Sequence, residues 1–304
     1  GGVLVSFFGK YTKYEQIIKN NNIKNNMFIF VMIKIRSVDA FVYRYPLEIP
    51  VQTSFGTMFD RPMVIVKLVD EDGVIGYGEV WCNYPAVGAE HRARLIKSIF
   101  APLICSKSLP SPADYFELLT SETQVLAVQT GEYGPIAQCI AGIDIAIHDL
   151  HAKKLSLPLW KLLGGTSDKV ATYGSGISPA NADKTAEAAL SAGHNALKLK
   201  IGLDTAVDIQ NISLLRRLLG KDEKLMVDAN QAWNLEEAIK NCNKLEKFDL
   251  NWLEEPIPAD SSLKDWKLLS EKTNIPLAAG ENFSGHEEFS KYFRNKVFKD
   301  TVIK

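Results

Sequence analysis

Four short polar groups recur at nearly even intervals between residues 196 and 282: Lys198-Leu199-Lys200, Asp228-Ala229-Asn230, Glu254-Glu255-Pro256 and Gly280-Glu281-Asn282. Each group follows or closes a short apolar run, as expected where a buried strand ends. The steps from Lys200 to Asp228, to Glu254 and to Glu281 are 28, 26 and 27 residues. That is about the length of one strand, one helix and two turns, so the period predicts a parallel βα repeat.

The carboxylates of these groups predict a divalent metal site. In a parallel barrel the strand C-termini point to one face, so polar groups with this period are expected to converge there. Three carboxylates and two lysines at one mouth would be electrostatically poor without a cation between them. Asp228, Glu254 and Glu281 offer the hard oxygen ligands that suit octahedral Mg²⁺. Glu255 is expected to point away from Glu254, so only one of this pair should be a ligand, and the spacing does not decide which.

The two lysines share one face of their strand because they are two residues apart. A solvated strand face is the ordinary explanation for such a pair. Strands of a parallel sheet between helices are buried on both faces, however, and these lysines occupy the same strand-end position as the carboxylates. A partly desolvated lysine in a cation-crowded pocket is a usable base near neutral pH. Asn230 is predicted to share the face of Asp228 and to hydrogen-bond a ligand there.

Composition bounds the class of protein. The 304 residues are 46% hydrophobic and 23% charged, with a net charge of −1 and no basic tract, which is typical of a soluble globular chain without a nucleic-acid or membrane surface. The four cysteines lie far apart without C-x-x-C pairs, so we expect a reducing cytoplasm rather than disulfides or zinc. The expected partners are a small-molecule carboxylate substrate and further copies of the chain in a homo-oligomer.

The N-terminal half predicts an extension and then an α+β domain. Residues 1–31 contain an Asn/Lys-rich run and are expected to be a non-native or disordered extension. Residues 32–165 are predicted to form a capping domain with strands over 33–43, 63–69 and 74–81 and helices over 91–103, 112–119 and 135–155. Gly76 and Gly78 lack the third glycine and the following helix of a dinucleotide fingerprint. Two loops, 50–59 and 81–88, are rich in large side chains.

Residues 166–304 are predicted to form the (β/α) barrel domain. Strands are expected over 170–174 and 198–201 and at Asp228, Glu254 and Glu281, with a sixth beginning at 301. The helices between them are expected over 182–192, 204–219, 234–248, 262–272 and 287–293, with Asn181 and Asn234 as N-caps and Gly193 and Gly220 as stops. Closing a barrel takes about eight strands, so we expect this barrel to be truncated at its C-terminus.

Together these pieces resemble the mandelate racemase/muconate lactonizing group of the enolase superfamily. The resemblance runs from about residue 32 to residue 304 and includes segments of the N-terminal half. The matching segments are Lys198-Leu-Lys200-Ile-Gly, Val227-Asp-Ala-Asn-Gln-Ala-Trp233, Trp252-Leu-Glu-Glu-Pro256, Gly280-Glu-Asn282, Gly142-Ile-Asp-Ile-Ala-Ile-His-Asp-Leu150 and Leu157-Pro-Leu-Trp-Lys-Leu-Leu-Gly-Gly165.

The resemblance implies an α+β capping domain on a modified TIM barrel of the (β/α)₇β type. It implies Mg²⁺ on Asp228, Glu254 and Glu281, because the group assigns the metal to the first Glu of the Glu-Glu-Pro segment. It also implies abstraction of the proton α to a carboxylate through an enediolate, with Lys200 as the base and Lys198 neutralising the substrate carboxylate. The two bulky loops, with Phe55, Trp81 and Tyr84, would close over the barrel mouth and select the substrate.

The exact reaction stays open at this stage. The group places a second acid or base on later strands, a His–Asp dyad or a Lys, and the sequence stops before that region. Dehydration, racemisation, epimerisation and cycloisomerisation of a hydroxy-acid, sugar-acid or amino-acid-type substrate therefore all remain. We also keep two alternatives: a Schiff-base lyase that uses Lys198 or Lys200, and a non-catalytic barrel homologue. Both chain ends are expected to reflect an incomplete reading frame.

Overall fold

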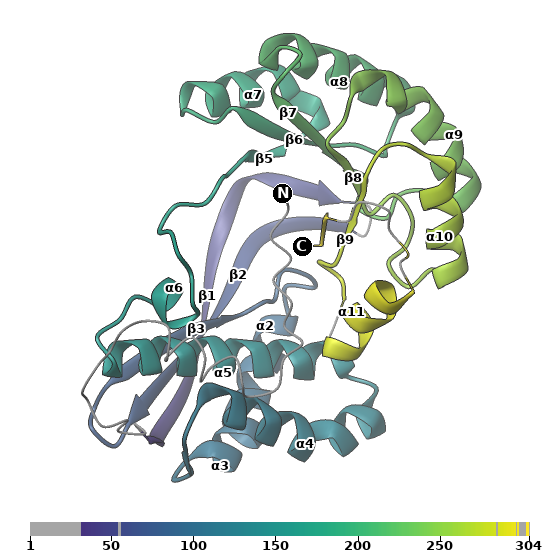
Figure 1. Cartoon of the computed structure of the whole chain (residues 1–304). Coiled ribbons are helices and arrows are strands. Elements are labelled where there is room, and N and C mark those ends of the chain that lie inside the picture. The colour runs from purple at the N-terminus through teal and green to yellow at the C-terminus, as the bar shows by residue number, and fades with distance from the viewer. Residues whose placement is uncertain (1–31, 54–55, 284, 296, 298–301, 304) are drawn as a thin grey trace. The chain divides into compact units, whose positions relative to one another are not determined.

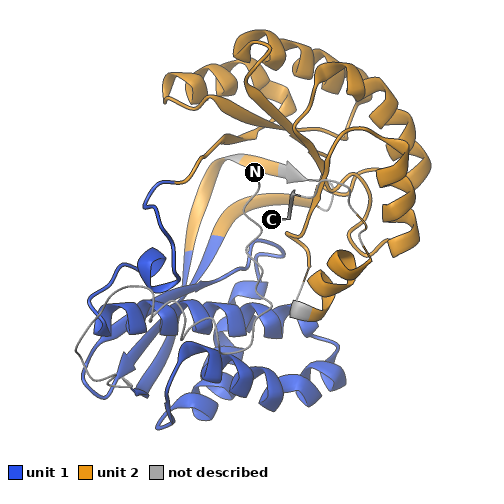
Figure 2. Ribbon diagram, in the orientation of Figure 1, with its two compact units in different colours: residues 1–43, 62–169 blue, residues 44–61, 170–304 orange. Residues whose placement is uncertain are grey.

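The computed structural model describes residues 32–53, 56–283, 285–295, 297 and 302–303, and the expected extension over 1–31 lies outside this part. The chain divides into two compact units (Figure 2). Unit 1 comprises the described residues of Gly1–Tyr43 and Pro62–Lys169, and unit 2 comprises those of Arg44–Arg61 and Val170–Lys304. The division after Lys169 lies close to the boundary expected at 165.

Unit 1 is built on a four-stranded sheet, in which the order is β3-β2-β1-β4 (Figure 1). The strands are β1 (Ile33–Thr53), β2 (Gly56–Asp70), β3 (Ile75–Val80) and β4 (Ser108–Leu109). β2 and β3 pair antiparallel from Val64↔Val80 to Val69↔Ile75, as the hairpin prediction requires. β1 and β2 are much longer than predicted. Their distal residues 44–61, expected to belong to a loop and to the capping domain, are mostly strand and group with unit 2.

The helices of unit 1 cover this sheet. They are α2 (Gly88–Leu95), the π-helical turn η1 (Ile96–Phe100), α3 (Ala101–Ile104), α4 (Pro112–Thr130), α5 (Tyr133–Lys154) and α6 (Leu159–Leu162). The prediction for α4 ended too early: no glycine or proline interrupts the helix before Gly131, which takes the left-handed conformation at its C-cap. The apolar face predicted for α5 is buried, from Ile136 through Ile143 to Leu150.

Helix α5 lies directly on β3. A Cβ atom on Gly76 would stand 2.1 Å from the carbonyl oxygen of Ala146, and one on Gly78 would stand 2.1 Å from that of Gly142. No side chain fits in that space, so both positions require glycine. The two glycines therefore serve backbone packing, which agrees with rejecting a dinucleotide fingerprint.

Unit 2 contains a parallel sheet of six strands in the order β10-β9-β8-β7-β6-β5 among the described residues (Figure 1). The strands are β5 (Gly174–Ile177), β6 (Ala196–Lys200), β7 (Lys224–Asp228), β8 (Trp252–Glu254), β9 (Leu277–Ala279) and β10 (Val302–Ile303). The expected sixth strand is present, since Val302 pairs with Ala278. The first strand was predicted too early. It begins at Gly174, where a Cβ would lie 2.9 Å from that of Ala189, and the apolar Val170 is 83% exposed.

Helices alternate with the strands of unit 2 along the chain and pack against one face of its sheet (Figure 1). They are α7 (Ala182–Ser191), α8 (Thr205–Leu219), α9 (Leu235–Leu245), α10 (Leu263–Lys272) and α11 (Gly285–Arg294), with 3₁₀ turns η2 (Pro179–Asn181) and η3 (Glu246–Phe248). Asn234 caps α9 in a capping box, as predicted. Asn181 occupies the N-cap position of α7, as predicted, but its side chain makes no cap hydrogen bond to the described residues of this helix.

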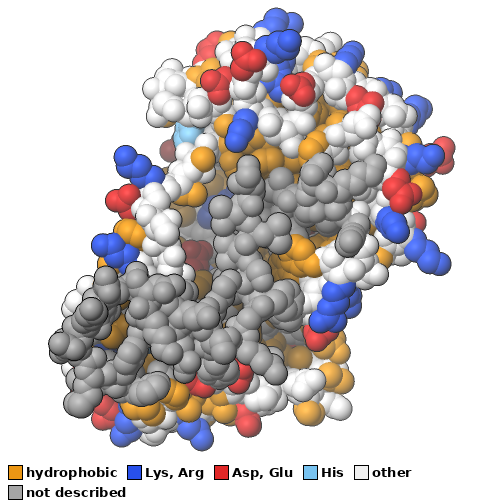
Figure 3. All heavy atoms as spheres, viewed as in Figure 1, with side chains coloured by type: hydrophobic (Ala, Val, Ile, Leu, Met, Phe, Trp, Pro, Cys, Tyr) orange, Lys and Arg blue, Asp and Glu red, His pale blue; other side chains and the backbone are white. Residues whose placement is uncertain are grey.

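Charge and hydrophobicity are distributed as the composition suggests. On the face drawn in Figure 3, Lys and Arg side chains lie scattered among Asp and Glu side chains, in keeping with the net charge of −1. None of the helices in the described ranges has both the length and the hydrophobicity that a membrane crossing needs.

Candidate active site

Three of the predicted site residues lie in one row across the parallel sheet of unit 2. Lys200 on β6 pairs with Asp228 on β7, and Asp228 pairs with Glu254 on β8. Each is the last residue of its strand, so the three side chains leave the sheet at the same edge. The βα period therefore brings a lysine and two carboxylates together at the C-terminal end of the strands.

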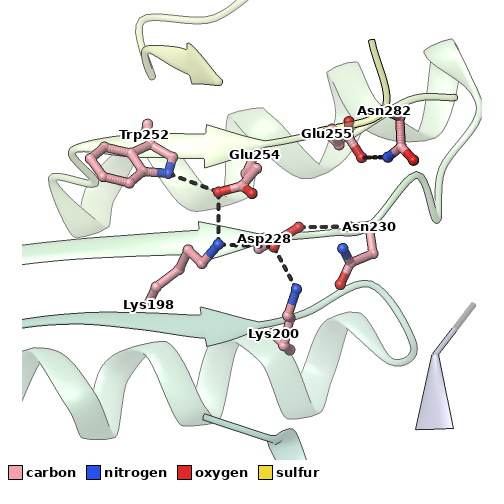
Figure 4. A network of polar contacts seen from close by, with 8 residues as sticks. All are labelled: Lys198, Lys200, Asp228, Asn230, Trp252, Glu254, Glu255 and Asn282. Carbon is pink, nitrogen blue, oxygen red and sulfur yellow. Dashed lines mark hydrogen bonds and ion pairs between the residues drawn. The ribbon is translucent and has the colours of Figure 1, made fainter. Parts of the chain in front are cut away.

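Both lysines bond to the same carboxylate oxygen (Figure 4). Lys200 Nζ lies 2.6 Å from Asp228 Oδ2, and Lys198 Nζ lies 3.2 Å from that atom. Lys198 Nζ also lies 2.9 Å from Glu254 Oε2. Lys198 thus bridges two carboxylates from neighbouring strands, and Lys200 pairs with one of them.

The two lysines differ in depth. Lys198 is 3% exposed, whereas the Lys200 side chain keeps 35% of its surface accessible. Asp228 and Glu254 are both buried. Although burial raises the pKa of Asp228, the ammonium groups of Lys200 and Lys198 outweigh it and hold that pKa below its usual value. Asp228 is therefore an anion at neutral pH, and Lys200 is the lysine that a solute can reach.

Glu255 turns away from the lysines, as expected for the second residue of the pair. Its Oε2 accepts a hydrogen bond of 2.7 Å from Asn282 Nδ2, while its buried Oε1 has no hydrogen-bond partner among the described residues. Burial and the nearby charge of Glu281 raise the pKa of Glu255 to about 7. Its φ of +38° lies in the left-handed region, where a non-glycine residue is uncommon.

Glu281 follows β9 on the same segment as Asn282, and its side chain is exposed. Among the described residues no three Asp, Glu, His or Cys side chains are already arranged as a metal-ligand set. The lysines occupy oxygens of Asp228 and Glu254 instead. The ligand role of Glu281 consequently stays a prediction.

Asn230 contacts the site differently from what the strand register suggested. β7 ends at Asp228, and Asn230 has a φ of +44°. Its backbone N–H donates to Asp228 Oδ1 at 3.0 Å. Asn230 therefore lies beside Asp228 because of this backbone hydrogen bond. The predicted reason, a shared strand face, is wrong because β7 has already ended at Asp228.

The structure gives no contact between the described residues of this site and the three aromatic residues predicted to select the substrate. Phe55 lies outside the described residues. Trp81 and Tyr84 belong to unit 1, where they are 51% and 37% exposed. Their role stays a prediction.

Two aromatic residues of unit 2 that the sequence analysis did not assign to the site contact it. Trp252 Nε1 donates to Glu254 Oε2 at 3.3 Å, and the Lys198 ammonium lies 5.8 Å from the centre of the Tyr173 ring. The available signal for Trp252 was its place two residues before Glu254, which puts both side chains on one face of the strand.

The donor set suits a hard divalent cation. Asp228 and Glu254 are buried carboxylates, and Glu281 adds a third carboxylate that is exposed. Oxygen ligands of this kind favour Mg²⁺ over softer metals. These three carboxylates also outnumber the two ammonium groups of Lys198 and Lys200. The residues present therefore fit a magnesium site.

Comparison with known proteins decides the family. The N-terminal domain model of mandelate racemase/muconate lactonizing enzymes matches residues 35–164, and the enolase C-terminal domain-like model matches residues 181–299. The chain belongs to the mandelate racemase/muconate lactonizing enzyme group of the enolase superfamily. The barrel fold with an N-terminal capping domain, expected from the sequence, is confirmed by the structural relatives of this group.

Individual relatives of the group are enzymes. The chain is 30% identical over 266 residues to 3,6-anhydro-alpha-L-galactonate cycloisomerase from Streptomyces coelicolor, covering 86% of this chain and 72% of that protein. Other relatives are a racemase, dehydratases and epimerases.

Two solved structures extend the comparison. A mandelate racemase/muconate lactonizing enzyme from Bordetella bronchiseptica RB50 is 42% identical with a TM-score of 0.83, covering 89% of this chain and 71% of that one. A racemase from Streptomyces coelicolor A3(2) with bound magnesium is 28% identical with a TM-score of 0.80, covering 87% and 74%.

Proposed function

We propose that the protein is a Mg²⁺-dependent enzyme that removes the proton α to a carboxylate and so dehydrates, racemises or epimerises a hydroxy-acid, sugar-acid or amino-acid-type substrate. The observation that carries the proposal is the cluster at the ends of β6, β7 and β8, where two lysines share Asp228 Oδ2 and one of them also bonds Glu254. Membership of a family whose named relatives include racemases, epimerases and dehydratases supports it.

Lys200 is the proposed base because its side chain is the accessible one of the pair. It must be neutral to accept the α proton, and the ammonium that forms is held by Asp228 Oδ2 at 2.6 Å. An anionic partner that already faces the nitrogen stabilises this charged product without reorganisation. Proton transfer by a positioned side chain typically contributes about 10²–10⁴-fold in rate.

Lys198 is proposed to neutralise the substrate carboxylate. It is buried between Asp228 and Glu254, so its position is fixed before a substrate arrives. Asp228, Glu254 and Glu281 are the residues proposed to hold Mg²⁺. When bound, Mg²⁺ supplies Lewis-acid stabilisation of the negative charge that develops on the substrate.

Several narrower expectations belong to the proposal. Phe55, Trp81 and Tyr84 are proposed to contact the substrate, and the chain is proposed to act as a homo-oligomer. The four cysteines are not paired with one another, and a reducing cytoplasm stays the expected location.

The test is α-proton exchange in D₂O. The protein is incubated with a panel of sugar acids, hydroxy acids and N-acylamino acids, with Mg²⁺ or with EDTA, and deuterium at the α carbon is followed by NMR. Exchange that requires Mg²⁺ is the expected result. Exchange that is unaffected by EDTA, together with borohydride trapping of Lys198 or Lys200 on a carbonyl substrate, would favour the Schiff-base lyase instead.

Calorimetry with Mg²⁺ alone separates the enzyme from a non-catalytic barrel. Binding at one site is expected in the wild-type chain, and Asp228→Asn is expected to abolish it. Ser213→Ala on α8 is a matched control, because its hydroxyl bonds only the helix carbonyl of Ile209. Absence of binding in the wild type would contradict the proposed function.

A further inference from the structure

Glu254 is held by two donors that reach the same oxygen from different residues. Oε2 lies 2.9 Å from Lys198 Nζ and 3.3 Å from Trp252 Nε1 (Figure 4). Two donors on one oxygen fix the orientation of the carboxylate plane more narrowly than either alone. The Trp252 indole N–H is thus part of what sets the position of a proposed metal ligand.

Trp252 is itself held by a closed circuit of contacts. The Tyr173 and Trp252 rings meet edge to face, with centroids 5.6 Å apart and an interplanar angle of 78°. The Lys198 ammonium lies 5.8 Å from the Tyr173 ring centre, within the range of a cation–π contact. The contacts therefore form a closed circuit, which runs from Lys198 to Glu254, Trp252, Tyr173 and back to Lys198. Displacing one of these side chains is expected to loosen the others.

In the strand register, Lys198 and Trp252 lie two residues before the row of Lys200, Asp228 and Glu254. Lys198 on β6 and Trp252 on β8 both pair with Met226 on β7. From this earlier position on their strands, the side chains of Lys198 and Trp252 both extend toward the C-terminal edge of the sheet and bond Glu254 Oε2. The aromatic pair therefore supports the site from inside the sheet.

The chemistry of an indole donor differs from that of an ammonium. Lys198 carries a charge that the proposed reaction also needs for the substrate carboxylate. The indole N–H is an uncharged donor that does not titrate and cannot accept a hydrogen bond. Trp252 can therefore keep its bond to Glu254 while Lys198 serves the substrate.

We infer that Trp252, supported by Tyr173, is a positioning residue that orients Glu254, and through it Lys198, for metal binding and proton abstraction. This role rests on the proposed function, because it concerns the same cluster. Partners that orient metal ligands typically contribute about 10–100-fold to metal affinity or activity.

The experiment compares Trp252→Phe with Trp266→Phe. Trp266 on α10 is fully buried, and its ring packs edge to face against Tyr292, whereas Trp252 is half-buried. The control therefore removes an indole from unit 2 that lies deeper than Trp252. Affinity for Mg²⁺ alone is measured by calorimetry. Trp252→Phe is expected to weaken binding about tenfold, while Trp266→Phe leaves it unchanged.

A spectroscopic readout keeps the test independent of folding defects. The chain has five tryptophans, so its indole ¹H–¹⁵N spectrum is simple, and loss of one signal in Trp252→Phe assigns Trp252. The chemical shift of this indole signal is expected to change in Glu254→Gln without metal. In the wild type it is expected to change on addition of Mg²⁺, with the same midpoint concentration as the binding curve from calorimetry. Replacing Trp252 by benzothienylalanine, which has a sulfur in place of the N–H, retains the ring shape and should weaken Mg²⁺ binding as Trp252→Phe does.

The outcomes separate the two proposals. Wild-type binding that is equally tight in Trp252→Phe and in the benzothienylalanine protein would overturn the role of Trp252 and leave the proposed function standing. An indole signal that ignores Glu254→Gln would overturn it as well. A wild-type chain that binds no Mg²⁺ would overturn both.

Discussion

Each unit buries a lysine against carboxylates, and the two clusters differ in whether the buried acids have a hydrogen-bond donor on every oxygen. In unit 1, Asp70 is 0% exposed, its Oδ1 accepts from Val74 N at 2.8 Å, and its Oδ2 pairs with Lys154. Lys154 also pairs with the exposed Asp72. Every oxygen of the buried acid has a donor, and the cluster joins the β2–β3 turn to the end of α5.

The cluster of unit 2 is left incomplete. Lys198 and Lys200 face Asp228 and Glu254, and the further carboxylates of Glu255 and Glu281 are close enough to influence each other. Among the described residues, Glu255 keeps one buried oxygen without a hydrogen-bond partner. A buried polar atom without a partner is uncommon in a cluster that serves stability alone. This difference between the two clusters agrees with the ligand-binding role proposed for the cluster of unit 2.

The largest expected effect concerns the accessible lysine of unit 2. Lys200→Met should lower the rate of α-proton exchange about 10³-fold, because it removes the proposed base. Asp228 keeps its bond to Lys198, so the fold should survive. Exchange is measured in D₂O with the substrate found in the panel, and folding is checked by circular dichroism. A rate within tenfold of wild type would contradict the assignment.

The equivalent change in unit 1 should alter stability instead of catalysis. Lys154→Met leaves the buried Asp70 carboxylate with the backbone N–H of Val74 as its one donor among the described residues, which should cost about 3–5 kcal/mol of unfolding free energy. Urea denaturation at pH 7 measures it.

Lys153→Met is the matched control for this change. Its side chain is 45% exposed and pairs with Asp149 on the surface, so the expected loss is at most about 1 kcal/mol. Equal losses of unfolding free energy in Lys154→Met and Lys153→Met would mean that burial of an ion pair does not determine its contribution to stability.

The smallest expected effect concerns Asp208 on α8, a buried acid of unit 2 outside the cluster of Lys198, Lys200, Asp228 and Glu254. Its Oδ2 accepts from Gly202 N at 2.9 Å, and its Oδ1 has no hydrogen-bond partner in the described part of the chain. Burial raises the pKa of Asp208 from 3.8 to about 6. Because the folded-state pKa is the higher one, the folded state binds more protons between these values. The stability contribution is therefore complete below about pH 4 and is lost as pH rises through about 6.

Asp208→Asn removes this titration and keeps an oxygen that can accept from Gly202. At pH 8 the variant should be more stable than wild type by about 3 kcal/mol, and the difference should vanish below about pH 4. Unfolding free energies from pH 3.5 to 8 check this, with Asp222→Asn on the exposed α8–β7 turn as the control. A gain that is independent of pH would show that the charge is not its cause.

The row of Lys200, Asp228 and Glu254 was predictable because it depends on two regular periods. Side chains alternate along a strand, and the βα repeat returns each polar group to the same edge of the sheet. Neither period depends on details of packing. The helix cap at Asn234 was likewise visible as a local signal.

The remainder of the site depends on backbone conformations that no period describes. Asn230 and Glu255 both have positive φ after their strands end, so strand alternation no longer governs their side chains. Trp252 has the pattern of an ordinary core residue, and the contacts that join it to Tyr173, and Tyr173 to Lys198, involve residues from other strands or loops of the unit. The start of β5 was missed because close packing against Ala189, rather than hydrophobicity, selects Gly174.

The seam between β3 and α5 has a consequence for the segment that carries Trp81 and Tyr84, the two residues of unit 1 proposed to contact the substrate. Gly76 and Gly78 bring two backbones together without intervening side chains, so there is little in that seam for mutation to remodel. β3 ends at Val80, immediately before this segment. The segment therefore departs from an anchored base, and substitutions within it are expected to leave the seam in place.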